Sequence, residues 1–182
     1  MSEIMRLYSQ HCRQLGPREL TSLVAMDIHP DALGWGNGQF AVMAASVRWE
    51  GEQWFDFAPN GEGARAAIIV CLGVDGQAQD LAAWAPSEGR LALRWGHVAM
   101  IGEEQLALPR LEGDRLWVHQ SPDEWLAHRR TGVVIVNYDA ARSRLPSPIA
   151  VKTREHKSEL EARWSVPRIQ VFNVGMAEAI AS

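Results

Sequence analysis

Residues 114–172 repeat one pattern, a short apolar run followed by a stretch of helical character, and this repetition constrains the fold more than any other feature of the chain. Apolar runs lie at Leu116–Val118 and Val133–Val136, a third lies within residues 147–153, and a last one closes the region at Arg168–Phe172. Strands that alternate with helices predict a small parallel sheet with crossover helices. Such sheets bind ligands at the carboxyl ends of their strands.

The residues that follow these predicted strands are polar, but they do not form a motif of known chemistry. They are His119 and Gln120, then Asn137–Asp139, then Thr153–His156. Asp139 and Glu155 each follow a buried strand, so a Mg²⁺ site that uses both carboxylates is one hypothesis. The competing interpretation makes Asp139 a helix cap, since aspartate is favoured at that position.

The first part of the chain has a different character. Two helices are expected within residues 3–15 and 17–26, separated by Gly16 and Pro17. Residues 39–101 predict an antiparallel meander of about five strands, with a hairpin turn at Asp75 and Gly76. Glycine and proline at 109–113 mark a boundary. We therefore expect an α+β fold with two domains: residues 1–110 form a helical pair and a meander, and residues 111–182 form a small βαβαβαβ unit packed against them.

Composition excludes several classes of protein. The 182 residues carry a net charge of −4 and only two cysteines, Cys12 and Cys71, which form no disulfide framework or zinc motif. The six histidines lack the short spacings of metal-ligand pairs. No apolar stretch is long enough for a signal peptide or a membrane span. A cytoplasmic protein without a membrane partner or a cofactor is expected, and Mg²⁺ enters only with the Asp139 and Glu155 hypothesis.

Basic residues concentrate between Arg142 and Arg168, where seven of them stand against three acids. This segment carries +4 and the remainder of the chain −8. A local basic face of this kind permits binding to nucleic acid. Aromatic and basic side chains that could combine base stacking with phosphate contacts are Trp125, Arg129, Arg130, Arg154 and Lys157. The alternative is that the tryptophans are core residues and the cations lie on solvated helices.

The order of an antiparallel region and a βαβαβαβ unit resembles the core of bacterial and phage primases, in which the second unit is a Toprim domain. The segment LWVHQSPDEWLAH is similar to the family's first acidic strand end, with His119 and Gln120 in place of Glu-Gly. In AVKTREH, residues 153–155 stand in place of Asp-x-Asp, and VVIVNYD half matches that motif. The segment VDGQAQDLAAWAPSEGRLALRWG also resembles the hairpin that precedes the Toprim domain. The resemblance covers residues 66–172 and implies a degenerate member without the catalytic acids.

Three functional hypotheses follow. The leading one is a non-catalytic accessory or binding protein of a phage or mobile element, which acts on nucleic acid or on a replication protein. The second is a Mg²⁺-dependent phosphoryl-transfer enzyme, primase-like or nuclease-like, with Asp139 and Glu155 as its catalytic residues. The third is a protein-interaction or oligomerisation domain, indicated by the eight tryptophans.

Overall fold

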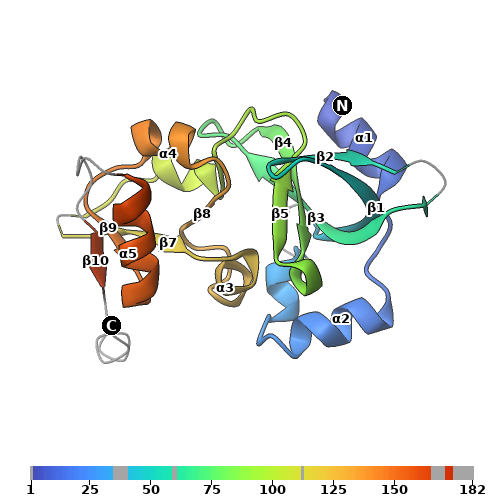
Figure 1. The fold of residues 1–182 in the computed structure, drawn as a ribbon, viewed down its shortest axis with the longest axis horizontal. Helices are drawn as coiled ribbons and strands as arrows, with labels where there is room; N and C mark the ends of the chain where they lie inside the picture. Colours follow the sequence, from blue (N-terminus) through green and yellow to red (C-terminus); the bar gives the residue numbers. More distant parts are fainter. Residues whose placement is uncertain (1, 35–40, 59–60, 112, 165–170, 174–182) are drawn as a thin grey trace.

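The computed structural model describes residues 2–34, 41–58, 61–111, 113–164 and 171–173, and within them it has two β-sheets that lie side by side (Figure 1). One sheet is a closed barrel of five strands, and the other, which we call the mixed sheet, also has five. The α+β class expected from the sequence is confirmed. No helix in these described ranges is both long enough and apolar enough to cross a membrane.

The two N-terminal helices form as their sequences predict. They are α1 (Glu3–His11) and α2 (Pro17–Val24). The Ser2 hydroxyl caps α1 by accepting a hydrogen bond from the N–H of Met5. Proline opens α2, where its missing N–H costs nothing, and the Glu19 carboxylate accepts from the N–H of Gly16. The hydroxyl of Tyr8 donates to the carbonyl of Ala41, which fixes α1 beside the barrel.

The five strands expected as an antiparallel meander close into a barrel. Its strands are β1 (Met43–Glu50), β2 (Trp54–Phe57), β3 (Ala64–Leu72), β4 (Ala78–Ala85) and β5 (Arg90–Leu93). β1 pairs with both β2 and β3, and a parallel contact between β2 and β5 closes the ring. The closing ladder has one residue pair, Trp54 with Leu93, so β2 and β5 are joined at one end only. The barrel cluster combines large residues such as Phe55, Ile68 and Leu81 with small ones, which are Ala45, Ala66, Ala83, Ala85 and Ala92.

The mixed sheet holds the parallel unit that the repeating pattern predicts. Its strands are β6 (Met100–Ile101), β7 (Leu116–His119), β8 (Val133–Ile135), β9 (Ile149–Val151) and β10 (Val171–Asn173), in the order β10-β9-β7-β8-β6. β7 to β10 run parallel, whereas β6 is antiparallel to β8. β6 therefore joins the mixed sheet although it precedes residue 110. Residues 168–170 of the predicted last strand lie outside the described residues.

Three helices connect these parallel strands and cover the mixed sheet on both faces. They are α3 (Pro122–Ala127), α4 (Tyr138–Arg144) and α5 (Arg154–Arg163). Buried residues of α4 and α5 pack with Leu116 and Val118 on one face of β7. Residues of α3 pack on the other face, in a cluster that also takes residues from the barrel and α2. Short 3₁₀ turns, η1 (Pro30–Leu33), η3 (Pro86–Glu88) and η4 (Glu103–Ala107), complete the connections.

The turn after α3 differs from the sequence prediction. The helix ends at Ala127, and Arg129 and Arg130 follow it with φ angles of 52° and 63°, rather than forming its last turn. The Arg130 Nε donates to the carbonyl of Ala32 at 2.6 Å, so this arginine joins the mixed sheet to η1. Gly132 is needed because a Cβ there would lie 2.5 Å from the Trp117 carbonyl oxygen.

The buried carboxylate of Asp80 holds the chain where it leaves the barrel for the mixed sheet. Asp80 lies in β4 and is fully buried. Its Oδ1 accepts from the N–H groups of Arg94 and Trp95 at 3.2 and 3.1 Å, and its Oδ2 accepts from the N–H of His97 at 2.8 Å. A buried carboxylate is tolerated only with such donors, and the turn in return has its N–H groups satisfied.

Replacing Asp80 by Ala should lower the free energy of unfolding by about 3 kcal/mol, because the backbone N–H groups of Leu81, Arg94, Trp95 and His97 lose a charged acceptor. The measurement is urea unfolding followed by tryptophan fluorescence. The matched control is Asp75→Ala in the exposed β3–β4 turn, where the carboxylate accepts from the N–H of Gln77. The free energy of unfolding of the Asp75→Ala control should fall by less than about 1 kcal/mol. Equal losses in the two variants would contradict the role assigned to Asp80.

Candidate functional site

The strand order places the topological switch point of the mixed sheet between β7 and β9. The chain passes from β7 to its neighbour β8 and then crosses to β9 on the other side of β7. The β7–α3 and β9–α5 connections therefore diverge at the carboxyl edge, and this point of reversal is where open α/β sheets bind ligands. We call the residues at this position the switch-point site: His119, Gln120, Glu124, Thr153, Arg154 and His156.

His119, the last residue of β7, presents a buried and uncharged imidazole. Its side chain is 4% exposed, and its Nε2 lies 2.8 Å from the carbonyl oxygen of Thr131. A carbonyl can only accept, so Nε2 carries the hydrogen and Nδ1 holds a lone pair. Burial lowers the pKa of His119, which keeps the ring neutral at pH 7. The ring of His128 lies 4.8 Å away, centroid to centroid.

Glu124 brings a carboxylate to the same connection. It lies in the first turn of α3, and its Oε2 accepts from the N–H of Gln120 at 3.0 Å. Ser121 occupies the N-cap position, as the sequence predicts, but its side chain makes no capping hydrogen bond. The carboxylate of Glu124 therefore satisfies the backbone at the end of β7 and brings a negative charge near both buried histidines.

The β9–α5 connection contributes the second buried histidine. Thr153 caps α5, and its hydroxyl accepts from the N–H of His156 at 3.1 Å. The His156 side chain is 3% exposed, and its ring makes no hydrogen bond to another described residue. Burial lowers the pKa of His156, while Glu159 and Glu124 oppose the shift. Because Glu124 belongs to α3, this coupling places the ring on the side of α5 that faces the β7–α3 connection.

The rim of the site is basic. Lys152 and Arg154 flank the cap and are both exposed. The N–H groups of Arg154 and Glu155 have no acceptor within the helix, because the first turn of any α-helix lacks one. These N–H groups and the dipole of the ten-residue α5 favour a negative charge at this position. The site thus combines the cations Lys152 and Arg154 and the N-terminal turn of α5 with the carboxylates of Glu124 and Glu155 and two buried imidazoles.

The residues predicted for nucleic-acid binding are divided between two edges of the mixed sheet. Arg154 and Lys157 lie in the first turn of α5 at the carboxyl edge, and Lys157 contacts Glu161 at 3.8 Å. Arg129 and Arg130 follow α3 and precede β8, at the amino edge. Trp125 is 3% exposed, and its indole donates to the Gly132 carbonyl, so its face is not open to a base.

The carboxylates predicted for Mg²⁺ follow strands that are not neighbours. Asp139 follows β8 and Glu155 follows β9, and β7 runs between these two strands. Two strand spacings amount to about 10 Å. Both side chains are exposed, and Asn137 rather than Asp139 caps α4. In the part of the chain that the structure describes, no group of three His, Cys, Asp or Glu residues could hold a metal ion.

Sequence reasoning named His119 and His156 as strand-end residues but gave them no shared role. They are 37 positions apart, and no local spacing connects them. The usable signal was structural: one residue ends a strand, and the other lies three positions after a helix cap that follows a second strand.

Comparisons with known proteins found no matching family, no similar curated protein and no similar solved structure.

The two buried histidines should make stability depend on pH. A histidine in the unfolded chain has a pKa near 6.5, and burial lowers the pKa of both His119 and His156 in the folded state. Below pH 6.5 the unfolded chain therefore binds more protons, and the free energy of unfolding falls as the pH drops towards the folded-state values. Above pH 6.5 both states are neutral and this contribution vanishes.

Urea unfolding between pH 7.5 and 5 measures this dependence. The double variant with His119→Gln and His156→Gln should lose stability less steeply with acid than the natural chain. An unchanged slope in the double variant would rule out the two buried rings as its source.

Proposed function

We propose that this protein is a binding module that holds a phosphate group at the switch-point site. The observation that carries the proposal is the position of His156, a buried imidazole without a hydrogen-bond partner among the described residues, beneath the basic first turn of α5. A phosphate at the rim would accept from the N–H groups of Arg154 and Glu155 and form a charged contact with the Arg154 side chain. The His156 ring can donate from below.

The phosphate group can belong to a free nucleotide or to a nucleic acid strand, because the site would make the same contacts to phosphate in both. The nucleic acid is supported by the basic residues of α5, since phosphate contacts dominate the affinity of such complexes. It also agrees with the primase resemblance, in which a member without catalytic acids keeps a binding role. In that reading the protein is an accessory factor that acts on a nucleic acid or beside a replication protein.

A titration with two ligands tests the proposal and separates the two sources of phosphate. Calorimetry at low salt compares adenosine monophosphate with a 5′-phosphorylated single-stranded oligonucleotide. A strand that binds more tightly, and whose affinity falls as salt rises, identifies nucleic acid as the ligand. Equal affinities for the two ligands identify a nucleotide site. Absence of binding by both contradicts the proposal.

Arg154→Ala should weaken binding of the better ligand about tenfold, since it removes one charged contact to phosphate. Arg163→Ala is the matched control, because it removes the same charge from the opposite end of α5. The control should change the affinity less than about twofold at 150 mM salt, where charges separated by more than about 8 Å are screened. Equal losses in both variants would point to a non-specific effect of net charge.

The phosphoryl-transfer hypothesis remains a separate prediction. It requires a divalent ion bound by Asp139 and Glu155, and calorimetric titration with Mn²⁺ measures that binding directly. Under this hypothesis Asp139→Asn weakens Mn²⁺ binding and leaves the phosphate affinity of the switch-point site unchanged. The oligomerisation hypothesis also stays a prediction, and light scattering after size exclusion tests it.

A further inference from the structure

Two neighbouring cavities lie against the barrel, one beside the end of α1 and the other beside α2, far along the chain from the switch-point site. The first has a volume of about 670 Å³ and is lined mainly by polar groups, including Gln10, His11, Arg13, Ser46 and Arg65. The second has a volume of about 330 Å³ and an apolar lining that includes Leu15, Leu23, Met26, Ala66 and Pro86. Ala44 and Arg65 line both, so Arg65 stands at their junction.

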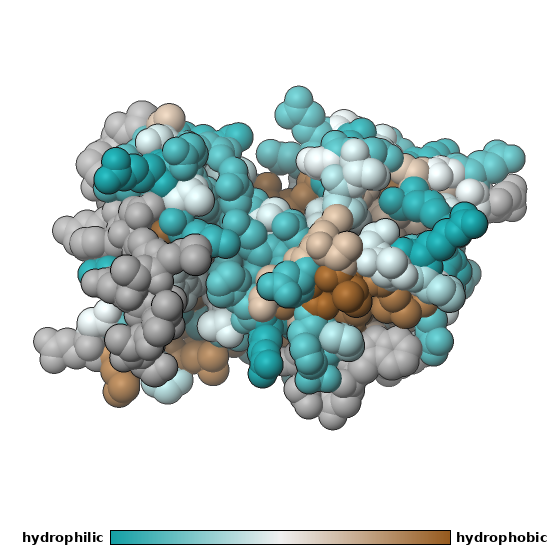
Figure 2. All heavy atoms as spheres, turned by 90° about the horizontal axis from the view of Figure 1, so that it is seen from below, coloured by the Kyte–Doolittle hydropathy of each residue, from teal (hydrophilic) through white to brown (hydrophobic). Residues whose placement is uncertain are grey.

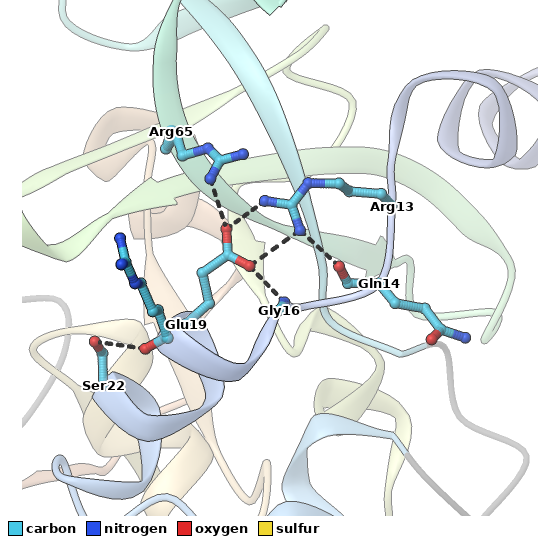
Figure 3. Close-up of polar contacts among 7 residues, drawn as sticks. Arg13, Gln14, Gly16, Glu19, Ser22 and Arg65 are labelled. Atoms are coloured by element: carbon cyan, nitrogen blue, oxygen red, sulfur yellow. Dashed lines mark hydrogen bonds and ion pairs between the residues drawn. The ribbon is translucent and has the colours of Figure 1, made fainter.

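Arg65 is the most exposed member of a charged cluster at this junction. Figure 3 shows the Glu19 carboxylate between Arg65 of β3 and Arg13 of the α1–α2 connection. The Arg65 Nη1 lies 3.6 Å from Glu19 Oε1, which is a long contact, and the arginine side chain is 69% exposed. Its other N–H groups are available to a ligand, because no further interaction of this side chain is present among the described residues.

Arg13, in contrast, is held in place. Its two terminal nitrogens donate to the two oxygens of Glu19 at 3.1 and 2.6 Å, and Nη1 also donates to the carbonyl of Gln14 (Figure 3). Hydrogen bonding from Arg13 lowers the pKa of Glu19, which therefore stays ionised. Two guanidinium groups and one carboxylate leave a net positive charge beside both cavities.

The apolar cavity continues onto an apolar surface. Val24 and Met26, at the end of α2, are 56% and 38% exposed. Figure 2 shows hydrophobic residues gathered in the region of α2 on a face that is otherwise largely hydrophilic. An apolar group that entered this cavity would therefore bury more than its own surface, with a gain of roughly 25 cal/mol for each Å² removed from water.

We propose that this junction binds the C-terminus of a peptide whose last residue is apolar. The C-terminal carboxylate would pair with Arg65, and the last side chain would enter the apolar cavity beside Leu23 and Met26. The preceding backbone would lie in the polar cavity, where the Ser46 hydroxyl has no hydrogen-bond partner among the described residues. A peptide end fits both cavities, whereas a fatty acid has no polar chain to fill the larger one.

Calorimetry with the N-acetylated tripeptide glycyl-seryl-leucine and its C-terminal amide tests the proposal. The acid should bind at least tenfold more tightly than the amide, because only the acid pairs with Arg65. A tripeptide that ends in glycine should bind about tenfold or more weakly than the leucine tripeptide, because it buries no apolar side chain. Octanoate that bound as tightly as the acid would replace the peptide by a fatty acid and overturn the proposal.

Variants of the protein complete the test. Arg65→Ala should reduce the affinity for the acid to that for the amide, so that the two changes are not additive. Arg65→Lys keeps the charge without the fork geometry and should retain part of the preference. Arg48→Ala removes an exposed arginine from β1 and should change the affinity less than about twofold. An acid-to-amide preference that survives Arg65→Ala, with the variant shown to be folded by thermal unfolding, would overturn the proposal.

Discussion

The buried carboxylate of Asp80 is the interaction on which the arrangement of the two sheets depends. It accepts hydrogen bonds from Arg94, Trp95 and His97, which are the residues that carry the chain out of the barrel. Immediately after them comes β6, the strand that borders the mixed sheet beside β8. A change in this turn would displace β6, and the register of β6 on β8 is part of what places the carboxyl edge. One side chain in the barrel thereby holds the segment that leads into the mixed sheet.

The sequence predicted most of the strands and helices, but it did not predict that five of the strands close into a barrel. The period of the apolar residues identified most strands, and the caps and prolines located α2, α3 and α5, because these signals are local. Closure of the barrel depends on a contact between β2 and β5, which are some 40 residues apart and meet only through Trp54 and Leu93. β6 is only two residues long, so the alternation of its apolar residues cannot show which sheet it joins.

The same distinction applies to the switch-point site. Its position was predictable, since the carboxyl ends of parallel strands are where such sheets bind ligands. Its chemistry was not, because the proximity of His119 and His156 depends on the order β9-β7-β8, and that order cannot be read from spacing. Trp125 agrees with the alternative that the tryptophans are core residues, since it is buried and its indole N–H donates to the Gly132 carbonyl.

The apolar cluster that takes residues from α2, the barrel and α3 has a consequence for how the chain can be divided. Leu23, Leu93 and Trp125 belong to this one cluster although they come from three separate parts of the sequence. A fragment that ends near residue 110 would lose Trp125, Leu126, Val134 and Val136 from that cluster and expose the apolar residues they cover to water, with the tendency to aggregate that such surfaces bring. The two sheets are thus obligate partners, and they should melt in one cooperative transition as a single folding unit.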